Sequence, residues 1–390
     1  MRIGFFGGSF DPVHTEHVRL AQSAVRDLGL DKLIVIPAAQ PPHKKGKILA
    51  DGARRLEMCR LAFEELPCVE ISDYELSKNG LSYTYLTCEH FRGLYPTAEL
   101  FWLVGTDMLR DFPTWKYPEK ILQNVTLAVC ARAEDKAWED KEQENFYRAF
   151  GKNFAVLRYC GADVSSTKIR VLAGAGMDLS DFVPQKVADY ITKNRLYFIN
   201  GAPQGLALEK ESRKQHSLRV ATLAAKRAVS LGLSERKAIA AALFHDCAKN
   251  LTADSPYLKD FSLSEEWRNV PPSVLHQYQG AYVAERFFAV NDKEIIDAIR
   301  FHTSGRPNMG ELEKLIFLAD MLEEERSYDC VDELRALFWR REGLDECLTE
   351  ALRQTLIFIE RKGATLYPLT KAAYEFYKNE RKKESKYGNE

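Results

Sequence analysis

The chain has 390 residues, which at roughly 150 residues per domain corresponds to two or three domains. Its 55 basic and 56 acidic residues give a net charge of -1, which argues against a protein that coats nucleic acid or an anionic membrane. The hydrophobic fraction of 45% is ordinary for globular domains and excludes collagen-like or largely disordered chains.

Further features of the sequence predict the cellular location. No apolar run approaches the roughly 18 residues needed to span a bilayer, and the first residues lack the pattern of a signal peptide. The eight cysteines are scattered without a CxxC pair, which favours free thiols in a reducing compartment over a disulfide framework. We therefore expect a cytoplasmic protein without nucleic-acid or membrane partners, and assembly into a homo-oligomer is left open.

Apolar, strand-like runs alternate with helical patterns over residues 1–195. This alternation implies βαβ units and a doubly wound parallel sheet of the α/β, Rossmann-like class, in which ligands bind outside the carboxyl ends of the strands. The expected strands lie at residues 1–6, 32–37, 68–72, 98–105, 125–132 and 154–159.

The strand pattern disappears after residue 206, and the helical period that replaces it predicts an all-α bundle. The expected helices of this half lie within residues 212–232, 234–249, 273–288, 292–302, 310–325 and 344–363. Gly and Pro in NGAPQG mark a linker, and the charged end of the chain is typical of a frayed tail. The expected organisation is an α/β domain at 1–199, a linker at 200–205, a helical domain at 206–378 and a tail at 379–390.

The first expected strand runs directly into GGSFDPVHTEH, residues 7–17, which has the features of a phosphate site. Gly7 and Gly8 carry no Cβ, so the backbone can approach a ligand closely. His14 and His17 share one face of a helical turn that begins near Thr15. The free N–H groups of that turn favour phosphate, and the paired imidazoles can stabilise charge on a transferring phosphoryl group.

A second phosphate-binding pattern is SSTKIR, residues 165–170, in which hydroxyl groups at a helix start are followed by a cation. Between the two patterns, PPHKK supplies Lys44, GTD at 105–107 follows a strand end, and Trp115 follows in FPTWK.

These motifs together resemble a known family. GGSFDPVHTEH is similar to the GG-[ST]-F-D-P-x-H-x-x-H signature of nucleotidylyltransferases, with Glu16 where the usual HxGH motif has Gly. SSTKIR is similar to the ISSTxIR motif, and with PPHK, GTD and Trp115 the resemblance over about residues 1–196 is to bacterial nicotinate mononucleotide adenylyltransferases. It implies in-line attack of nicotinate mononucleotide on ATP with Mg²⁺, which gives nicotinate adenine dinucleotide for NAD synthesis. The same motifs disfavour an adenylyltransferase for phosphopantetheine.

The resemblance also implies roles for individual residues. It assigns the ATP phosphates to the catalytic residues His14, His17, Lys44 and Arg170. It assigns the remaining named contacts as phosphate caps (Ser165, Thr167), ribose contact (Asp107) and pyridine mononucleotide contacts (Thr84, Trp115). Further substrate contacts are expected from Gly7, Gly8, Ser9, Phe10, Asp11 and Gly105. The spacing leaves the choice between nicotinate and nicotinamide open.

The helical half contains His216, the pair His245–Asp246 and Asp320 in separate segments. An acid and a histidine beside a core-facing helix surface are costly unless they are paired or bind a metal. Histidine and carboxylate ligands together suit Fe, Mn or another divalent ion. Their wide spacing fits ligands that separate helices of a bundle bring together.

The set H…HD…D matches the HD-domain phosphohydrolase superfamily. The flanking segments RKQHSLRVA, FHDCAK, HQYQGA, IRFHTSGRPNM and FLADMLEEERSYD resemble bacterial HD proteins that hydrolyse diadenosine tetraphosphate symmetrically to two ADP. This resemblance covers about residues 206–375, and it implies a divalent transition metal, expected to be iron. The implied metal ligands are His216, His245, Asp246 and Asp320.

Asp246 is also expected to act in catalysis, because its carboxylate can reach the attacking water or a second ion. His276 and His302 either hold a second metal or contact phosphate. Further phosphate contacts are expected from Lys249, Thr303, Arg306 and Arg326. The leading interpretation is a bifunctional enzyme, and the alternative is an adenylyltransferase whose HD half is a nucleotide-binding regulatory sensor.

Overall fold

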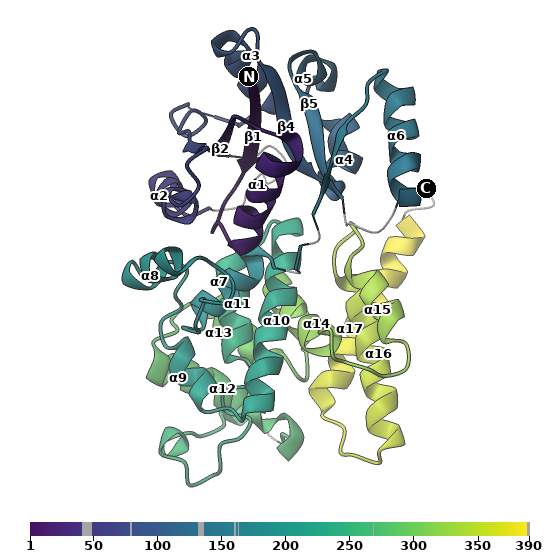
Figure 1. Cartoon of the computed structure of the whole chain (residues 1–390). Coiled ribbons are helices and arrows are strands. Elements are labelled where there is room, and N and C mark those ends of the chain that lie inside the picture. The colour runs from purple at the N-terminus through teal and green to yellow at the C-terminus, as the bar shows by residue number, and fades with distance from the viewer. Residues whose placement is uncertain are drawn as a thin grey trace. The chain divides into compact units, whose positions relative to one another are not determined.

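The computed structural model describes residues 1–40, 49–78, 80–131, 136–159, 161–162, 164–267 and 269–387 (Figure 1). The chain divides into two compact units. The first unit comprises Met1–Ile169 and Asp178–Leu196, and the second comprises Arg170–Met177 and Tyr197–Glu390.

The first unit is built on a six-stranded sheet with the order β3-β2-β1-β4-β5-β6, and every pairing is parallel. The strands are β1 (Arg2–Gly8), β2 (Lys32–Pro37), β3 (Val69–Ile71), β4 (Glu99–Gly105), β5 (Thr126–Ala131) and β6 (Ala155–Arg158). The register places Phe5 of β1 beside Ile34 of β2 and Trp102 of β4. The predicted doubly wound sheet and its strands are confirmed.

Helices lie between these strands, as the predicted βαβ units require, and two more follow the last strand. They are α1 (Thr15–Leu28), α2 (Gly52–Phe63), α3 (Thr84–Leu94), α4 (Thr106–Asp111), α5 (Pro118–Asn124), α6 (Lys136–Phe150), α7 (Ser166–Gly174) and α8 (Gln185–Lys193). On one face of the sheet, Ile3 and Phe5 pack in a core with Phe91 of α3 and Ile121 of α5. Successive strand residues face opposite sides, so Gly4 points the other way.

The order of the strands fixes where a ligand site can lie. β1 pairs with β2 on one side and with β4 on the other, so the chain reverses its winding direction between β1 and β4. In open α/β sheets this switch point leaves a crevice at the carboxyl ends of the strands. The turn after β1 leads into α1, and the turn after β4 leads into α4 at this edge.

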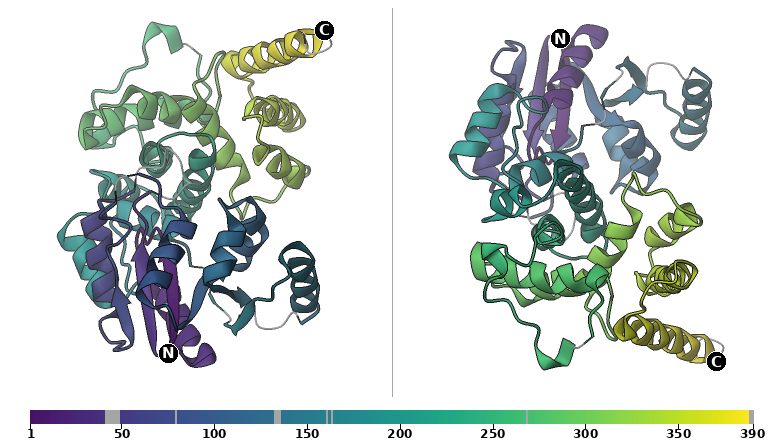
Figure 2. Two further views of the ribbon diagram at one scale, coloured as in Figure 1. Left: turned by 90° about the horizontal axis from the view of Figure 1, so that it is seen from above. Right: turned by 90° about the horizontal axis from the view of Figure 1, so that it is seen from below.

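The second unit is helical in the part of the chain that is described (Figure 2). Beyond the C-terminal part of α7 its α-helices are α9 (Ala202–Ala207), α10 (Glu211–Ser230), α11 (Glu235–Phe244), α12 (Pro272–Phe288), α13 (Lys293–Phe301), α14 (Glu311–Leu322), α15 (Val331–Phe338), α16 (Asp345–Arg361) and α17 (Pro368–Tyr387). Their apolar faces form one core that includes Ala224 of α10, Leu243 of α11, Ile299 of α13 and Leu315 of α14. The predicted all-α half is therefore confirmed.

Two segments differ from the sequence expectations. The expected linker 200–205 contains the start of α9, because Ala202 and Leu206 are buried in the core of the second unit. The expected frayed tail 379–390 is helical as far as Tyr387, where α17 ends. The buried Ala373 and Tyr377 on this helix show why it forms despite its charged end.

Among the described residues no helix is long and apolar enough to cross a membrane. The cysteines of the described residues are free, in agreement with their scattered spacing in the sequence.

Candidate functional site

The paired histidines lie at the switch point of the sheet, after the turn that follows β1. His14 is the N-cap of α1 and His17 lies in its first turn, and their rings stack with centroids 3.6 Å apart. The backbone N–H of His14 donates to Nδ1 of His17 at 3.1 Å. Burial lowers the pKa of His14 to about 4, so the imidazole is neutral near pH 7. Its Nδ1 is buried without a hydrogen-bond partner.

The glycines before these histidines have a packing role that the sequence did not predict. A Cβ on Gly7 would lie 2.7 Å from the ring of Trp102, and one on Gly8 would lie 3.0 Å from the ring of Phe10. Phe10 itself is buried at a positive φ of 45°. The carbonyl of Ser9 and the carboxylate of Asp11 accept hydrogen bonds from the chain around residues 50–55.

Two of the expected contacts lie at the end of β4, at the same edge of the sheet, and the other two lie elsewhere. Gly105 is the N-cap of α4, and the side chain of Asp107 in the first turn is 95% exposed. Thr84 begins α3 and is half-buried. Trp115 is buried with its ring 5.4 Å from that of Phe112, so the ring belongs to the core.

The residues of the SSTKIR pattern lie in two different environments, the start of α7 and a buried ion pair. Ser165 accepts a hydrogen bond from the N–H of Lys168 as expected at a helix start, and Thr167 lies in the first turn of α7. Arg170, further along α7, is buried and forms an ion pair with Glu235 at 2.5 Å. Lys44, also expected at the ATP phosphates, lies outside the described residues.

In the second unit the helices bring the expected metal ligands together. His216 lies on α10, His245 and Asp246 directly follow α11, and Asp320 lies on α14. Nε2 of His216 is 2.8 Å from Oδ1 of Asp320, and Nε2 of His245 is 3.6 Å from Oδ2 of Asp246. The helical bundle therefore joins residues that are far apart in the sequence.

His276 on α12 and His302 after α13 complete this cluster. Their Nε2 atoms are 3.2 Å apart, and they lie 3.3 and 3.4 Å from Oδ1 of Asp246. Nδ1 of His302 is 2.8 Å from the carbonyl of Ile299, which orients its Nε2 into the cluster. Both histidines therefore reach the carboxylate that was expected to bind the metal.

The charge state of the cluster suits cation binding. Burial lowers the pKa of His245 and of His276 to about 4, so both rings are neutral near pH 7. Burial alone would raise the pKa of Asp246, but the neighbouring histidines hold it well below its usual range. Burial would also raise the pKa of Asp320, but the hydrogen bond with His216 and the neighbouring His245 and His302 together lower it. Neutral imidazoles and ionised carboxylates are the protonation states that bind metal.

The positions of the ligand atoms are also compatible with a bound metal ion. Three groups, namely His216–His245–Asp246, His245–His302–Asp320 and Asp246–His276–His302, each place one ligand atom per residue within 4.8 Å of the others. Nε2 of His245 and both carboxylate oxygens of Asp246 are buried without a hydrogen-bond partner. These buried atoms therefore have lone pairs available for a cation.

Of the expected phosphate contacts, three reach the cluster. Nζ of Lys249 and Oγ1 of Thr303 lie 2.8 and 3.1 Å from Nε2 of His276. Arg326 donates to Oδ1 of Asp320 at 2.7 Å. Arg306 instead forms a bidentate pair with Glu313, with both distances 2.7 Å.

The structure adds charged residues around the cluster that the sequence analysis missed. Oε1 of Glu323 is 3.1 Å from Nδ1 of His216, and its other oxygen accepts from Arg219 at 2.7 Å. Arg213 lies 3.0 Å from Oδ2 of Asp246. Glu323 follows Asp320, and Arg213 precedes His216, by one helical turn, and this spacing was the available signal.

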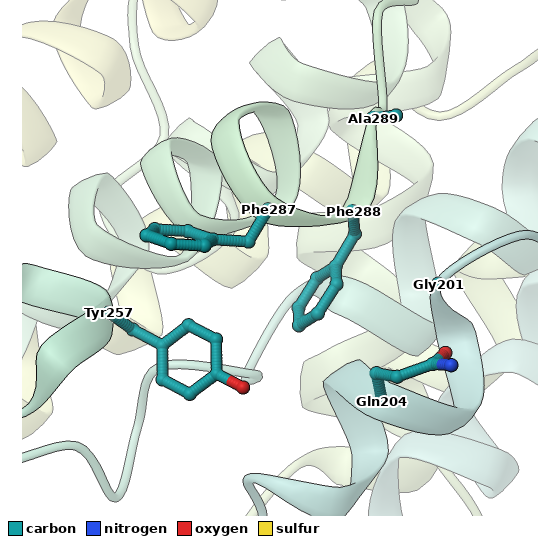
Figure 3. A pocket seen from close by; sticks show the side chains of 6 residues that line it. All are labelled: Gly201, Gln204, Tyr257, Phe287, Phe288 and Ala289. Carbon is teal, nitrogen blue, oxygen red and sulfur yellow. The ribbon is translucent and has the colours of Figure 1, made fainter.

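The second unit also has a pocket of about 460 Å³ that none of these ligands lines (Figure 3). It is lined by Gly201, Gln204, Tyr257, Phe287, Phe288 and Ala289. None of these six residues carries a carboxylate, an imidazole or a cationic group, so they offer no ligand set for a metal.

Fold and site together define the class. The first unit is an α/β nucleotide-binding sheet with paired histidines at its switch point, and the second is a helical bundle with a set of divalent-metal ligands. The cytidylyltransferase-like family model matches residues 5–172, and the HD domain model matches residues 213–325.

Relatives span both units. The Mycoplasma genitalium protein named "Probable nicotinate-nucleotide adenylyltransferase/Ap4A hydrolase" is 31% identical over 331 residues, which cover 84% of this chain and 89% of that protein. The Mycoplasma pneumoniae protein of the same name is 31% identical over 83% of this chain and 89% of its own length. The chain belongs to this family of two-part proteins.

A solved structure is similar to part of the chain. It is described as a "predicted HD superfamily hydrolase involved in NAD metabolism" from Clostridium acetobutylicum, and it is 32% identical. The match covers 46% of this chain and 95% of that chain, with a TM-score of 0.42.

Proposed function

We propose that the α/β half transfers the adenylyl group of ATP to nicotinate mononucleotide, which gives nicotinate adenine dinucleotide and pyrophosphate. The observation that carries this proposal is the stacked pair His14 and His17 at the switch point of the sheet. The names of the Mycoplasma relatives support the choice of substrate.

The reaction is a direct displacement at phosphorus. A phosphate oxygen of the mononucleotide forms a bond to the α-phosphorus of ATP while the bond from that phosphorus to pyrophosphate breaks. His14 and His17 donate hydrogen bonds to the charge that develops, and the hydroxyls of Ser165 and Thr167 hold the phosphates. Mg²⁺, bound together with ATP, would neutralise part of the phosphate charge.

We further propose that the helical half hydrolyses diadenosine tetraphosphate symmetrically to two ADP. The observation that carries this is the convergence of His216, His245, Asp246 and Asp320 in one buried cluster. These residues would hold a divalent cation, and we propose iron because mixed histidine and carboxylate ligands suit it. When bound, such an ion lowers the pKa of a water molecule and offsets charge at phosphorus.

The protein's own residues would orient the tetraphosphate for this hydrolysis. Water supplies the oxygen that adds to one of the two central phosphorus atoms, and the bridging bond between those two phosphates breaks. Lys249, Thr303 and Arg326 lie beside the ligands, where they can bind the phosphate oxygens. A purely regulatory HD half would tolerate the loss of ligands, whereas all of the expected ligands are present. We place both activities in the cytoplasm, where free thiols persist.

One crossed experiment tests both proposals. His17→Ala is expected to lower kcat for adenylyl transfer by on the order of 10²-fold and to leave hydrolysis unchanged. Asp246→Asn keeps the side-chain volume, and it is expected to abolish bound metal and hydrolysis while adenylyl transfer persists. Asp297→Asn is the matched control, because Asp297 is a buried carboxylate paired with Lys293 and Arg300 on α13.

The activities of these variants distinguish the proposed catalytic roles from the alternatives. Near-normal adenylyl transfer by His17→Ala would remove this histidine from the mechanism. Full hydrolysis by an Asp246→Asn protein without metal would contradict the metal site. Loss of both activities in Asp246→Asn would favour the regulatory sensor.

A further inference from the structure

Glu16 stands between the paired histidines, at the position where the resembling motif has glycine. It lies in the first turn of α1 and is 8% exposed, although a carboxylate is costly to bury without partners. A negative charge beside a site for ATP phosphates would also repel the ligand unless it were neutralised. The contacts of Glu16 offset both the cost of burying its carboxylate and the repulsion of the ATP phosphates.

Each oxygen of the Glu16 carboxylate accepts hydrogen bonds. Oε1 accepts from the guanidinium of Arg19, one turn along α1, at 2.8 Å. Oε2 accepts from the hydroxyl of Tyr159 and from the backbone N–H of Ala162, the latter at 2.8 Å. Burial would raise the pKa of Glu16, but these donors hold it below its usual value.

Tyr159 and Ala162 lie between β6 and the start of α7, on the path to Ser165 and Thr167. A Cβ on Gly161 would lie 2.8 Å from Oε2 of Glu16, so the backbone there packs directly on the carboxylate. A second tether follows, because Ser166 donates from its hydroxyl to the carbonyl of Pro12 at 3.0 Å. Glu16 and Ser166 therefore link the histidine segment to the SSTKIR segment.

We infer that Glu16 is a positioning residue for adenylyl transfer, whose carboxylate holds Tyr159 and Ala162 against α1 so that Ser165 and Thr167 meet the ATP phosphates. This inference rests on the proposed function of the α/β half. Glu16 needs no contact with substrate in this role. It fixes the distance between two phosphate-binding segments that are far apart in the sequence.

The test compares Glu16→Gly, Glu16→Gln and Tyr159→Phe in the full-length protein. Glu16→Gly is expected to raise KM for ATP by about 10-fold or more with a smaller change in kcat, because the segment loses its anchor. Tyr159→Phe should raise KM for ATP by a smaller factor. Glu16→Gln should also raise it less than Glu16→Gly, because its amide oxygen still accepts a hydrogen bond. Asp27→Asn is the matched control, since Asp27 pairs with Arg26 and Ser23 at the other end of α1.

Hydrogen exchange and ATP binding provide readouts that do not need turnover. The backbone amides of Gly161, Ala162, Val164 and Ser165 should exchange faster in Glu16→Gly than in the unmodified protein, and calorimetry should show weaker binding of ATP alone. Unchanged amide exchange and unchanged ATP affinity in Glu16→Gly would overturn the inference, even if the Tm fell. Absence of adenylyl transfer in the unmodified protein would instead refute the proposed function, while the exchange and calorimetry results would still decide the role of Glu16.

Discussion

At the scale of single residues, the metal site depends on second partners that orient its ligands. His216 shows this most clearly, because it is fixed from both ring nitrogens. Nε2 faces Asp320 at 2.8 Å, and Nδ1 faces Glu323 at 3.1 Å. A carboxylate on the far nitrogen fixes the tautomer of a ligating histidine and raises its basicity. Glu323 should therefore tune metal affinity without touching the metal.

Glu323→Gln tests this role. We expect metal affinity to fall about 10- to 100-fold, because the uncharged amide orients the imidazole less well. The measurement is metal content per chain after dialysis against a graded series of chelator concentrations. Glu313→Gln is the matched control, because Glu313 is a buried carboxylate on the same helix that pairs with Arg306. Equal metal retention in the two variants would contradict a role for Glu323.

His14 makes a prediction about pH. Burial lowers its pKa in the folded protein from the ordinary 6.5 to about 4. Between pH 6.5 and pH 4 the His14 side chain binds a proton in the unfolded chain but not in the folded protein. The free energy of unfolding is therefore unaffected by His14 above pH 6.5 and decreases as the pH falls from 6.5 towards 4. The loss by pH 5 is about 2 kcal/mol.

The comparison that checks it is between the unmodified protein and His14→Asn, which keeps a good N-cap for α1. Urea unfolding of the α/β unit at pH 7 and pH 5 should show a smaller loss of stability in the variant. If acidification weakened both proteins equally, His14 would not be the group responsible.

At the scale of helices and strands, the sequence predicted the elements with strong apolar patterns and missed those without them. The strand around Phe5 was visible because it is a short apolar run that ends at a pair of glycines. Helix α9 was not, because Gly201, Pro203 and Gly205 are typical of a linker. Its burial comes from tertiary packing, which overrides local propensity.

The same distinction applies to the sites. His14, His17 and the HD ligands lie in recognisable sequence motifs, so they could be predicted from the sequence. The partners of Arg170 and Arg306 could not be predicted, because Glu235 and Glu313 are ordinary helix residues whose position only the fold determines. Arg170 is therefore part of an ion pair in the structure, beside any role at the ATP phosphates.

Helix α9 yields a prediction that contradicts simple propensity. A Cβ on Gly205 would lie 2.9 Å from ring atoms of Phe244, which is fully buried and cannot move away freely. Gly205→Ala should therefore destabilise the helical unit by about 1–3 kcal/mol, although alanine favours helix. Gly93→Ala in α3 is the control, because a Cβ there meets nothing within 4 Å. It should be neutral or stabilise by about 0.5–1 kcal/mol. Thermal unfolding that ranked the two variants the other way would contradict this account.

At the scale of the whole molecule, the two units are interleaved along the chain. Helix α7 begins in the first unit and ends in the second, because the division falls between Ile169 and Arg170. The chain returns to the first unit at Asp178 and leaves it again after Leu196. The proposed domain limits, 1–199 and 206–378, therefore cut across the core of the second unit, which includes Val171 and Ala175.

This interleaving predicts how much stability the helical unit loses when the two halves are separated. We expect fragment 1–199 to fold and to retain adenylyl transfer, and fragment 204–390 to fold and to retain hydrolysis. The second fragment lacks Val171, Ala175, Ile199 and Ala202, all of which are buried in its core in the full chain. Loss of buried apolar side chains of this size costs a few kcal/mol in total, so its Tm should fall by roughly 5–10 °C relative to the same transition in the full chain.

Calorimetry of the full chain and of fragment 204–390, each with its metal content matched, measures the difference directly. Restoring the missing core as a fragment that begins at Val164 should recover most of the lost Tm, because it contains Val171 through Ala202 again. An equal Tm for fragment 204–390 and the full chain would mean that residues 170–177 do not stabilise the helical unit. Insolubility of both 1–199 and 204–390 would mean that the two halves cannot fold independently.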